Sequence, residues 1–191
     1  MEEKKALRRK MRAKRKQFVA GIPDAVRGLI LNRPPAEIVE ALRGKPVLGF
    51  YVATGDEAPT RGWIGWFHEN GWQIALPRFL AGQSGMKFAI WDNPFDDDEL
   101  EPGLLGIPQP ASDAAALVPD ALIIPLVAFT PDGDRLGQGG GHYDRWLAAN
   151  GDTIPIGLAW DCQLADGLPC EPHDRPLHAV VTPTRYYEGA A

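Results

Sequence analysis

The chain has 191 residues, of which 45% are hydrophobic and 24% are charged, and its formal net charge is −5. A chain of this length buries roughly 70% of its unfolded surface on folding, which excludes a wholly disordered protein. Its longest apolar stretch, from Ala121 to Phe129 with one proline inside it, is far shorter than the roughly 20 residues of a membrane span. The charged N-terminus also lacks the apolar core of a secretory signal. We therefore expect a single cytoplasmic domain over residues 1–191, with no membrane partner.

The beginning of the chain is strongly basic, whereas the remainder is acidic. Residues 1–16 hold nine basic and two acidic residues, a net charge of +7, so the rest of the chain carries −12. Leu7, Met11 and Phe18 recur at helical spacing, which predicts a basic N-terminal helix over residues 1–20 that docks on the body.

The cations of this helix admit three interpretations. They are a solvated face, a clamp for a phosphate ligand, or an arm that binds nucleic acid. Lys4 and Arg8 are four residues apart and so share one helix face, as a clamp requires. The acidity of the whole chain argues against nucleic-acid binding, because that affinity depends on surface cations that neutralise phosphates.

Beyond the basic helix, predicted helices alternate with predicted strands. Helices are expected at residues 24–31, 36–43, 59–70 and 141–149. Strands are expected at residues 46–52, 72–76, 87–91, 121–125, 154–160 and 179–182. Residues 92–120 are rich in loop formers, and the acidic run Asp96–Glu99 within them is interpreted as a solvated loop. The alternation predicts an α/β fold: a mostly parallel sheet with helices on both faces, in a Rossmann-like three-layer arrangement.

A glycine-rich segment follows the most apolar predicted strand and is the strongest chemical signal. Four of the five positions from Gly137 to Gly141 are glycine. Ligands bind at the carboxyl ends of strands in open α/β sheets, and glycines let backbone N–H groups approach a phosphate. Arg135 adds a guanidinium group, whose planar set of N–H donors can bind a phosphate. His142 stands where a dinucleotide fingerprint needs glycine, and no Gly-Lys-Ser/Thr follows, so the segment is a phosphate-type loop of another kind.

Two carboxylates are candidate magnesium ligands. Asp144 lies in the first turn of the predicted helix beside the glycines, where Mg²⁺ would join a carboxylate to phosphate oxygens. The alternative for Asp144 is a favourable interaction with the helix N-terminus. Asp174 looks like an ordinary turn residue from its local sequence. The chain has only two cysteines, and the spacing of Cys162, Cys170, His173 and His178 does not match a common zinc site.

Several segments together resemble the 5-formyltetrahydrofolate cyclo-ligase family, also called 5,10-methenyltetrahydrofolate synthetase. The specific part runs from Ile124 to Arg145 and includes Arg135-Leu136-Gly137 and Tyr143-Asp144. Other segments resemble the family individually less strongly but occur in the right order: Lys4 to Arg8, Glu57 to Thr60, Leu76 to Arg78, Ile107 to Pro110, and His173-Asp174.

The resemblance implies an ATP- and Mg²⁺-dependent ligase that converts 5-formyltetrahydrofolate into 5,10-methenyltetrahydrofolate and releases ADP and phosphate. It implies catalytic roles for Lys4, Arg8 and Arg135, and a metal site at Asp144 and Asp174. The ATP-binding residues would be Lys4, Lys5, Arg8, Arg135, Leu136, Gly137, Gln138, Gly139, Gly140, Gly141, His142 and Tyr143. The folate-binding residues would be Val52, Glu57, Gln138 and His142. We expect a monomer or weak dimer that binds no nucleic acid.

One residue departs from the family pattern. The family usually has two successive tyrosines before the aspartate, and this chain has His142-Tyr143. An imidazole still stacks and hydrogen-bonds, but it titrates near neutrality. The alternative to an active ligase is therefore a folate- or nucleotide-binding paralogue that has lost turnover.

Overall fold

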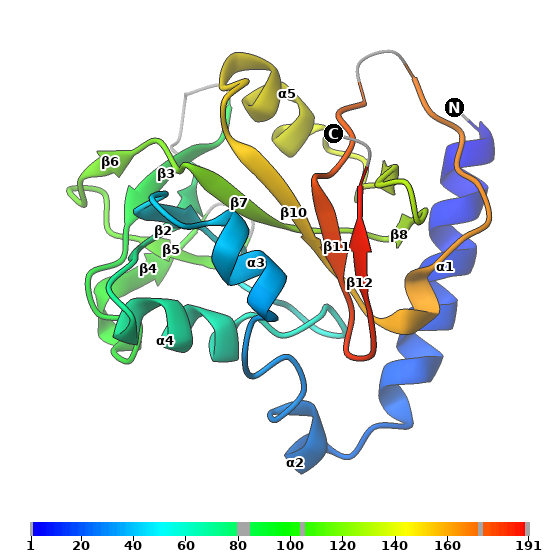
Figure 1. The fold of residues 1–191 in the computed structure, drawn as a ribbon, viewed down its shortest axis with the longest axis horizontal. Coiled ribbons are helices and arrows are strands. Elements are labelled where there is room, and N and C mark those ends of the chain that lie inside the picture. Colours follow the sequence, from blue (N-terminus) through cyan, green and yellow to red (C-terminus); the bar gives the residue numbers. More distant parts are fainter. Residues whose placement is uncertain (1, 80–84, 104–105, 172–173, 190–191) are drawn as a thin grey trace.

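An eight-stranded sheet runs through the computed structural model, which describes residues 2–79, 85–103, 106–171 and 174–189 (Figure 1). In spatial order its strands are β12 (Tyr186–Glu188), β11 (Ala179–Val181), β10 (Ile154–Leu158), β7 (Ala121–Pro125), β1 (Val47–Gly49), β2 (Gln73–Arg78), β3 (Lys87–Ile90) and β6 (Ala116–Leu117). The five strands from β11 to β2 are parallel, and β12, β3 and β6 pair antiparallel at the two ends. The prediction of a mostly parallel sheet is confirmed.

The order of the five parallel strands fixes where a ligand site is expected. Numbered along the chain, these strands lie in the order 2-1-3-4-5, because β1 stands between β2 and β7. This is the second common doubly wound order, and it differs from that of dinucleotide-binding folds. The Rossmann-like detail of the prediction is therefore not confirmed, whereas the α/β class with a mostly parallel sheet is.

Helices cover both faces of the sheet, as predicted. The helices of the described ranges are α1 (Glu2–Ala20), α2 (Asp24–Arg27), α3 (Ala36–Ala41), α4 (Arg61–Glu69) and α5 (His142–Ala149), and α2 buries no residue. Alternate residues of β7 point to opposite faces. Ile123 packs in one cluster with Ile38 of α3 and Trp63 of α4. Ile124 packs in a second cluster with Leu147 of α5, which explains why β7 is apolar throughout.

The basic helix α1 packs against the rest of the chain, although its contact face differs from the apolar pattern expected from the sequence. Met11, Arg15 and Val19 are its buried residues, one helical turn apart, whereas Phe18 is 38% exposed. Phe18 still lies beside Trp160, with ring centroids 6.0 Å apart. Of the helices in the described ranges, none combines the length and the apolarity that a membrane span requires.

Most differences from the predicted elements concern short segments. The helix expected at 24–31 ends at Arg27, and the strand expected at 46–52 covers only β1. The region 92–120 contains a 3-10 turn, η1 (Asp97–Glu99), and the short strands β4 (Leu100–Pro102), β5 (Pro108–Pro110) and β6. Strands of two or three residues carry too little alternation to be recognised from sequence.

A hairpin after β7 sets the position of Arg135. It pairs β8 (Ala128–Phe129) with β9 (Arg135–Leu136), and Gly133 lies in its turn with a φ of 93°. The Gly133 carbonyl oxygen accepts a hydrogen bond of 2.8 Å from the Leu177 N–H. A Cβ atom added at Gly133 would lie 2.5 Å from the Leu177 carbonyl oxygen, closer than real Cβ contacts.

We expect Gly133→Ala to destabilise the protein by about 2–4 kcal/mol, because it adds a backbone clash to the cost of a left-handed conformation. The matched control is Gly44→Ala. Gly44 has a φ of 75°, but a Cβ there meets nothing within 4 Å. The control should cost only about 1–2 kcal/mol. Urea denaturation measures both, and equal losses would show that the Leu177 contact is unimportant.

Candidate functional site

A cavity of about 900 Å³ opens at the carboxyl ends of β1 and β7, which are neighbours in the sheet. The chain leaves these two strands in opposite directions across the sheet. The parallel strand that follows β1 is its neighbour β2 on one side, and the parallel strand that follows β7 is its neighbour β10 on the other. Doubly wound sheets bind ligands at such a switch point. The lining after β1 consists of Tyr51, Val52, Thr54 and Glu57, and the lining after β7 includes residues 135–144.

The N-terminal half of α1 forms a cationic wall of the cavity. Lys4, Lys5 and Arg8 line it. Lys4 Nζ lies 2.7 Å from a carboxylate oxygen of Asp174 and 3.4 Å from one of Glu171. Burial alone would lower the pKa of Lys4, but these two carboxylates raise it above its ordinary value. Lys4 is therefore a full positive charge at neutral pH.

The glycine-rich loop lies against this wall. Arg8 Nε donates a hydrogen bond of 2.8 Å to the carbonyl oxygen of Gly137. Gly139 has a φ of 107°, and Gly141, the residue before α5, has a φ of 62°. These left-handed conformations explain glycine at both positions. The eight-residue helix α5 starts directly after them, so its N-terminus faces the same cavity.

A buried ion pair links Arg135 and Asp144 within the cavity wall. Arg135 Nη2 donates to Asp144, and only 4% of the Arg135 side chain is exposed. Arg135 Nε is buried and has no hydrogen-bond partner among the described residues. A buried guanidinium requires a partner for its charge, and Asp144 provides it. The pair holds a cation and a carboxylate side by side where phosphate and metal are expected.

The opposite wall carries the residues expected for the folate. Val52 and Glu57 line it together with Tyr51. The Tyr51 hydroxyl donates to the Ala58 carbonyl oxygen at 2.6 Å, and the Thr60 hydroxyl donates to the Tyr51 carbonyl oxygen at 3.0 Å. Burial and the charge of Glu57 raise the pKa of Tyr51 well above its ordinary value, so this phenol stays neutral and donates.

His142 packs on the aromatic ring of Phe79, the residue that directly follows β2. Its ring lies edge-on to Phe79, with centroids 5.1 Å apart at 78°. Arg145 Nη2 lies 3.3 Å from His142 Nδ1. Partial burial and the charge of Arg145 both lower the pKa of His142 below its ordinary value. The imidazole that replaces the family's usual tyrosine is therefore neutral at pH 7.

All of the site residues expected from the sequence line this one cavity, from Lys4 to Asp174. His173 lies outside the described residues. Sequence reasoning missed Tyr51, Phe79, Met86 and Glu171. The position of Tyr51 and Phe79 at the ends of β1 and β2 was an available signal. Within the described ranges, no group of three or more His, Cys, Asp or Glu residues could hold a metal.

A family model described as the 5-formyltetrahydrofolate cyclo-ligase family matches residues 1–183. The chain belongs to this family. The 5-formyltetrahydrofolate cyclo-ligase of Escherichia coli (strain K12) is 48% identical over 96 residues, which cover 47% of this chain and 53% of that protein. The probable 5-formyltetrahydrofolate cyclo-ligase of Caenorhabditis elegans is 31% identical over 156 residues, covering 74% of this chain and 72% of that protein. The chain thus spans about half the length of the first of these relatives.

A solved structure shows the same fold. The NMR structure of 5,10-methenyltetrahydrofolate synthetase from Aquifex aeolicus has a TM-score of 0.73 with 23% sequence identity. The match covers 97% of this chain and 92% of that chain. The similarity therefore extends over the cyclo-ligase family fold as a whole, including α1.

We expect Arg145→Gln to raise the pKa of His142. The arginine lowers that pKa through its positive charge, so its removal favours the imidazolium. NMR titration of the ring resonances measures the change. The control is Arg33→Gln, which removes a cation that packs over Trp66 instead. A pKa that stays constant or falls in Arg145→Gln would contradict the electrostatic role of Arg145.

Proposed function

We propose that this protein converts 5-formyltetrahydrofolate into 5,10-methenyltetrahydrofolate at the expense of ATP, releasing ADP and phosphate. The observation that carries the proposal is that the residues expected for both substrates line a single cavity. Its volume of about 900 Å³ is large for a small-molecule site and suits two ligands side by side. The family to which the chain belongs supports the same reaction.

The cationic wall and the glycine-rich loop suit the nucleotide. Lys4, Arg8 and Arg135 would neutralise phosphate charge, and the loop from Gly137 to Gly141 would supply backbone N–H groups. Phosphoryl transfer depends mainly on positioning and on such charge neutralisation. The folate would lie against Val52 and Glu57 on the opposite wall.

The proposed chemistry needs no protein nucleophile. The formyl oxygen attacks the γ-phosphorus as the bond to ADP breaks, which turns a poor leaving group into a phosphate ester. N10 of the same folate then attacks the formyl carbon. The carbon–oxygen bond breaks, phosphate leaves with its electron pair, and the N10 proton passes to solvent. Because the ring closure is intramolecular, a cavity that orients the folate supplies much of the rate.

Asp144 and Asp174 fit a magnesium site by donor chemistry. Both carboxylates line the cavity, and each is paired with a cation of the proposed nucleotide site, Arg135 or Lys4. Mg²⁺ commonly takes one or two carboxylates together with phosphate oxygens. When bound, it would neutralise charge on the transferred phosphoryl group. The two residues would hold it beside the glycine-rich loop.

The decisive experiment incubates the protein with 5-formyltetrahydrofolate, ATP and Mg²⁺ and follows the near-ultraviolet absorbance of the methenyl product. The control omits ATP. Binding of folate without product would favour the inactive paralogue. Salt-dependent retention of DNA or RNA that vanishes without residues 1–16 would favour nucleic-acid binding instead.

Three expectations from the sequence stay predictions: the single-domain organisation, the monomer or weak dimer, and the cytoplasmic location.

We expect Asp144→Asn to lower turnover by on the order of 100-fold, because the amide keeps the shape but loses the charge that holds Mg²⁺ and Arg135. Turnover is measured across a Mg²⁺ titration, with circular dichroism to check the fold. Asp152→Asn, at an exposed turn after α5, is the matched control. If the Mg²⁺ dependence of Asp144→Asn equals that of the control, Asp144 is not a metal ligand.

A further inference from the structure

The cationic face of α1 extends beyond the proposed nucleotide site. Lys4, Arg8 and Arg12 are four residues apart, so they lie along one side of the helix. Arg8 contacts Gly137, and Arg12 contacts the next residue of the glycine-rich loop, Gln138. The family resemblance gives roles to Lys4 and Arg8 but none to Arg12, although its guanidinium forms more of these contacts.

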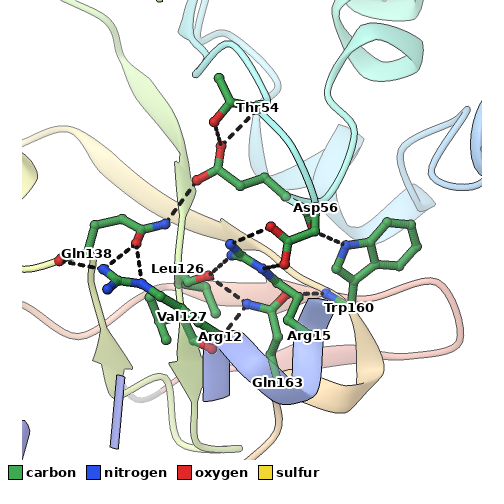
Figure 2. A network of polar contacts seen from close by, with 10 residues as sticks. Arg12, Arg15, Thr54, Asp56, Leu126, Val127, Gln138, Trp160 and Gln163 are labelled. Atoms are coloured by element: carbon green, nitrogen blue, oxygen red, sulfur yellow. Dashed lines mark hydrogen bonds and ion pairs between the residues drawn. The ribbon is translucent and has the colours of Figure 1, made fainter. Parts of the chain in front are cut away.

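Arg12 holds both the backbone and the side chain of Gln138 (Figure 2). Arg12 Nη2 donates to the Gln138 carbonyl oxygen at 2.9 Å and to its Oε1 at 2.8 Å, and Arg12 Nε donates to Oε1 at 3.1 Å. A planar guanidinium matches this arrangement of acceptors, whereas an ammonium group would not.

These contacts determine which way the Gln138 amide faces. A guanidinium only donates hydrogen bonds, so the amide oxygen must face Arg12. The amide nitrogen is thereby turned to the other side, where it donates to Glu57 Oε1 at 3.0 Å. A carboxylate only accepts, so both neighbours require the same amide orientation.

Glu57 is held at its second oxygen as well. Oε2 accepts from the Thr54 N–H at 3.0 Å and lies 3.2 Å from the Thr54 hydroxyl. A carboxylate has about four acceptor positions, and contacts within the described part of the chain use three of them. The remaining position is on Oε1, and Glu57 lines the cavity on the proposed folate side.

The backbone beside Glu57 is anchored separately. Arg15 forms an ion pair with Asp56 at 3.1 Å, and Trp160 Nε1 donates to the Asp56 carbonyl oxygen at 3.0 Å (Figure 2). Loss of Arg12 would therefore leave the backbone at Asp56 in place and affect mainly Gln138, at its carbonyl oxygen and its side chain, and the Glu57 carboxylate.

From this geometry we propose that Arg12 is a positioning residue for the folate. Through Gln138 it fixes the Glu57 carboxylate so that one acceptor position of Oε1 remains for a hydrogen-bond donor of the pterin. The inference rests on the proposed function. It also gives a structural basis for the two roles that the resemblance implies for Gln138, because this residue belongs to the loop expected to bind ATP and donates to Glu57, which is expected to bind folate.

The test compares Arg12→Met, Gln138→Met and the double variant by steady-state kinetics. Each single change should raise KM for 5-formyltetrahydrofolate about three- to tenfold, the equivalent of one or two hydrogen bonds. KM for ATP should change less in Arg12→Met. Because Arg12 acts through Gln138, the double variant should resemble Gln138→Met alone. Arg12→Lys should restore little, since lysine lacks the fork.

Arg9→Met is the matched control. Arg9 and Arg12 both line a second pocket, together with Lys5, Arg8 and Gln138. Within the described residues Arg9 has no hydrogen bond or ion pair, so its loss should leave KM for 5-formyltetrahydrofolate unchanged. Fluorescence quenching by 5-formyltetrahydrofolate gives a Kd for each variant as a second readout, which serves even if the protein lacks turnover.

The outcomes separate this inference from the proposed function. Wild-type protein that binds 5-formyltetrahydrofolate without turnover overturns the proposed reaction, and the Kd values still test Arg12. Wild-type protein that does not bind it overturns both. If Arg12→Met leaves folate KM and Kd unchanged, or if its effect adds fully to that of Gln138→Met, Arg12 does not act through Gln138.

Discussion

Basic side chains along one face of α1 hold the loops that make the cavity. Four of these side chains each reach an acceptor outside α1, and the acceptors lie in three segments that are far apart in the sequence: the segment after β1, the glycine-rich loop and the segment around Asp174. The contacts are Lys4 with Asp174, Arg8 with Gly137, Arg12 with Gln138, and Arg15 with Asp56. Loops at the end of a parallel sheet have few partners of their own, so a helix that supplies several donors in a row gives them a common support.

The burial of Arg15 shows why this support is specific. Its side chain is only 6% exposed, and it donates to Asp56 and to the Leu126 carbonyl oxygen. Gln163 Nε2 donates to the same carbonyl at 2.6 Å (Figure 2). A buried cation is costly unless its hydrogen bonds are made, so a shift of α1 that separated Arg15 from these acceptors would be unfavourable. The same position of α1 also places Lys4 and Arg8 beside the glycine-rich loop.

The sequence predicts the elements whose signals are local. β7 has the predicted bounds because its apolar run is continuous, and α5 follows the glycines to within one residue of the prediction. Residue chemistry indicated the glycine-rich loop, Arg135 and Asp144, the family resemblance added the folate-side residues and Asp174, and the fold brings all of them to one cavity. Contacts such as Arg12 with Gln138 span 126 residues, and hydrophobic periodicity carries no information about which polar partners meet. The hairpin of β8 and β9 and the edge strand β12 are too short to be recognised.

The ion pairs of Lys4 and Arg135 also bear on how the cavity responds to electrolyte. Before any nucleotide binds, Asp174 and Asp144 already neutralise these two cations. Both pairs are largely buried, so added salt screens them little, whereas it weakens the attraction of a phosphate that approaches from solvent. Because the pairs persist in salt, the net positive charge that a phosphate would meet is smaller than the number of cations in the cavity. The proposed nucleotide affinity would therefore depend on ionic strength less steeply than that number suggests.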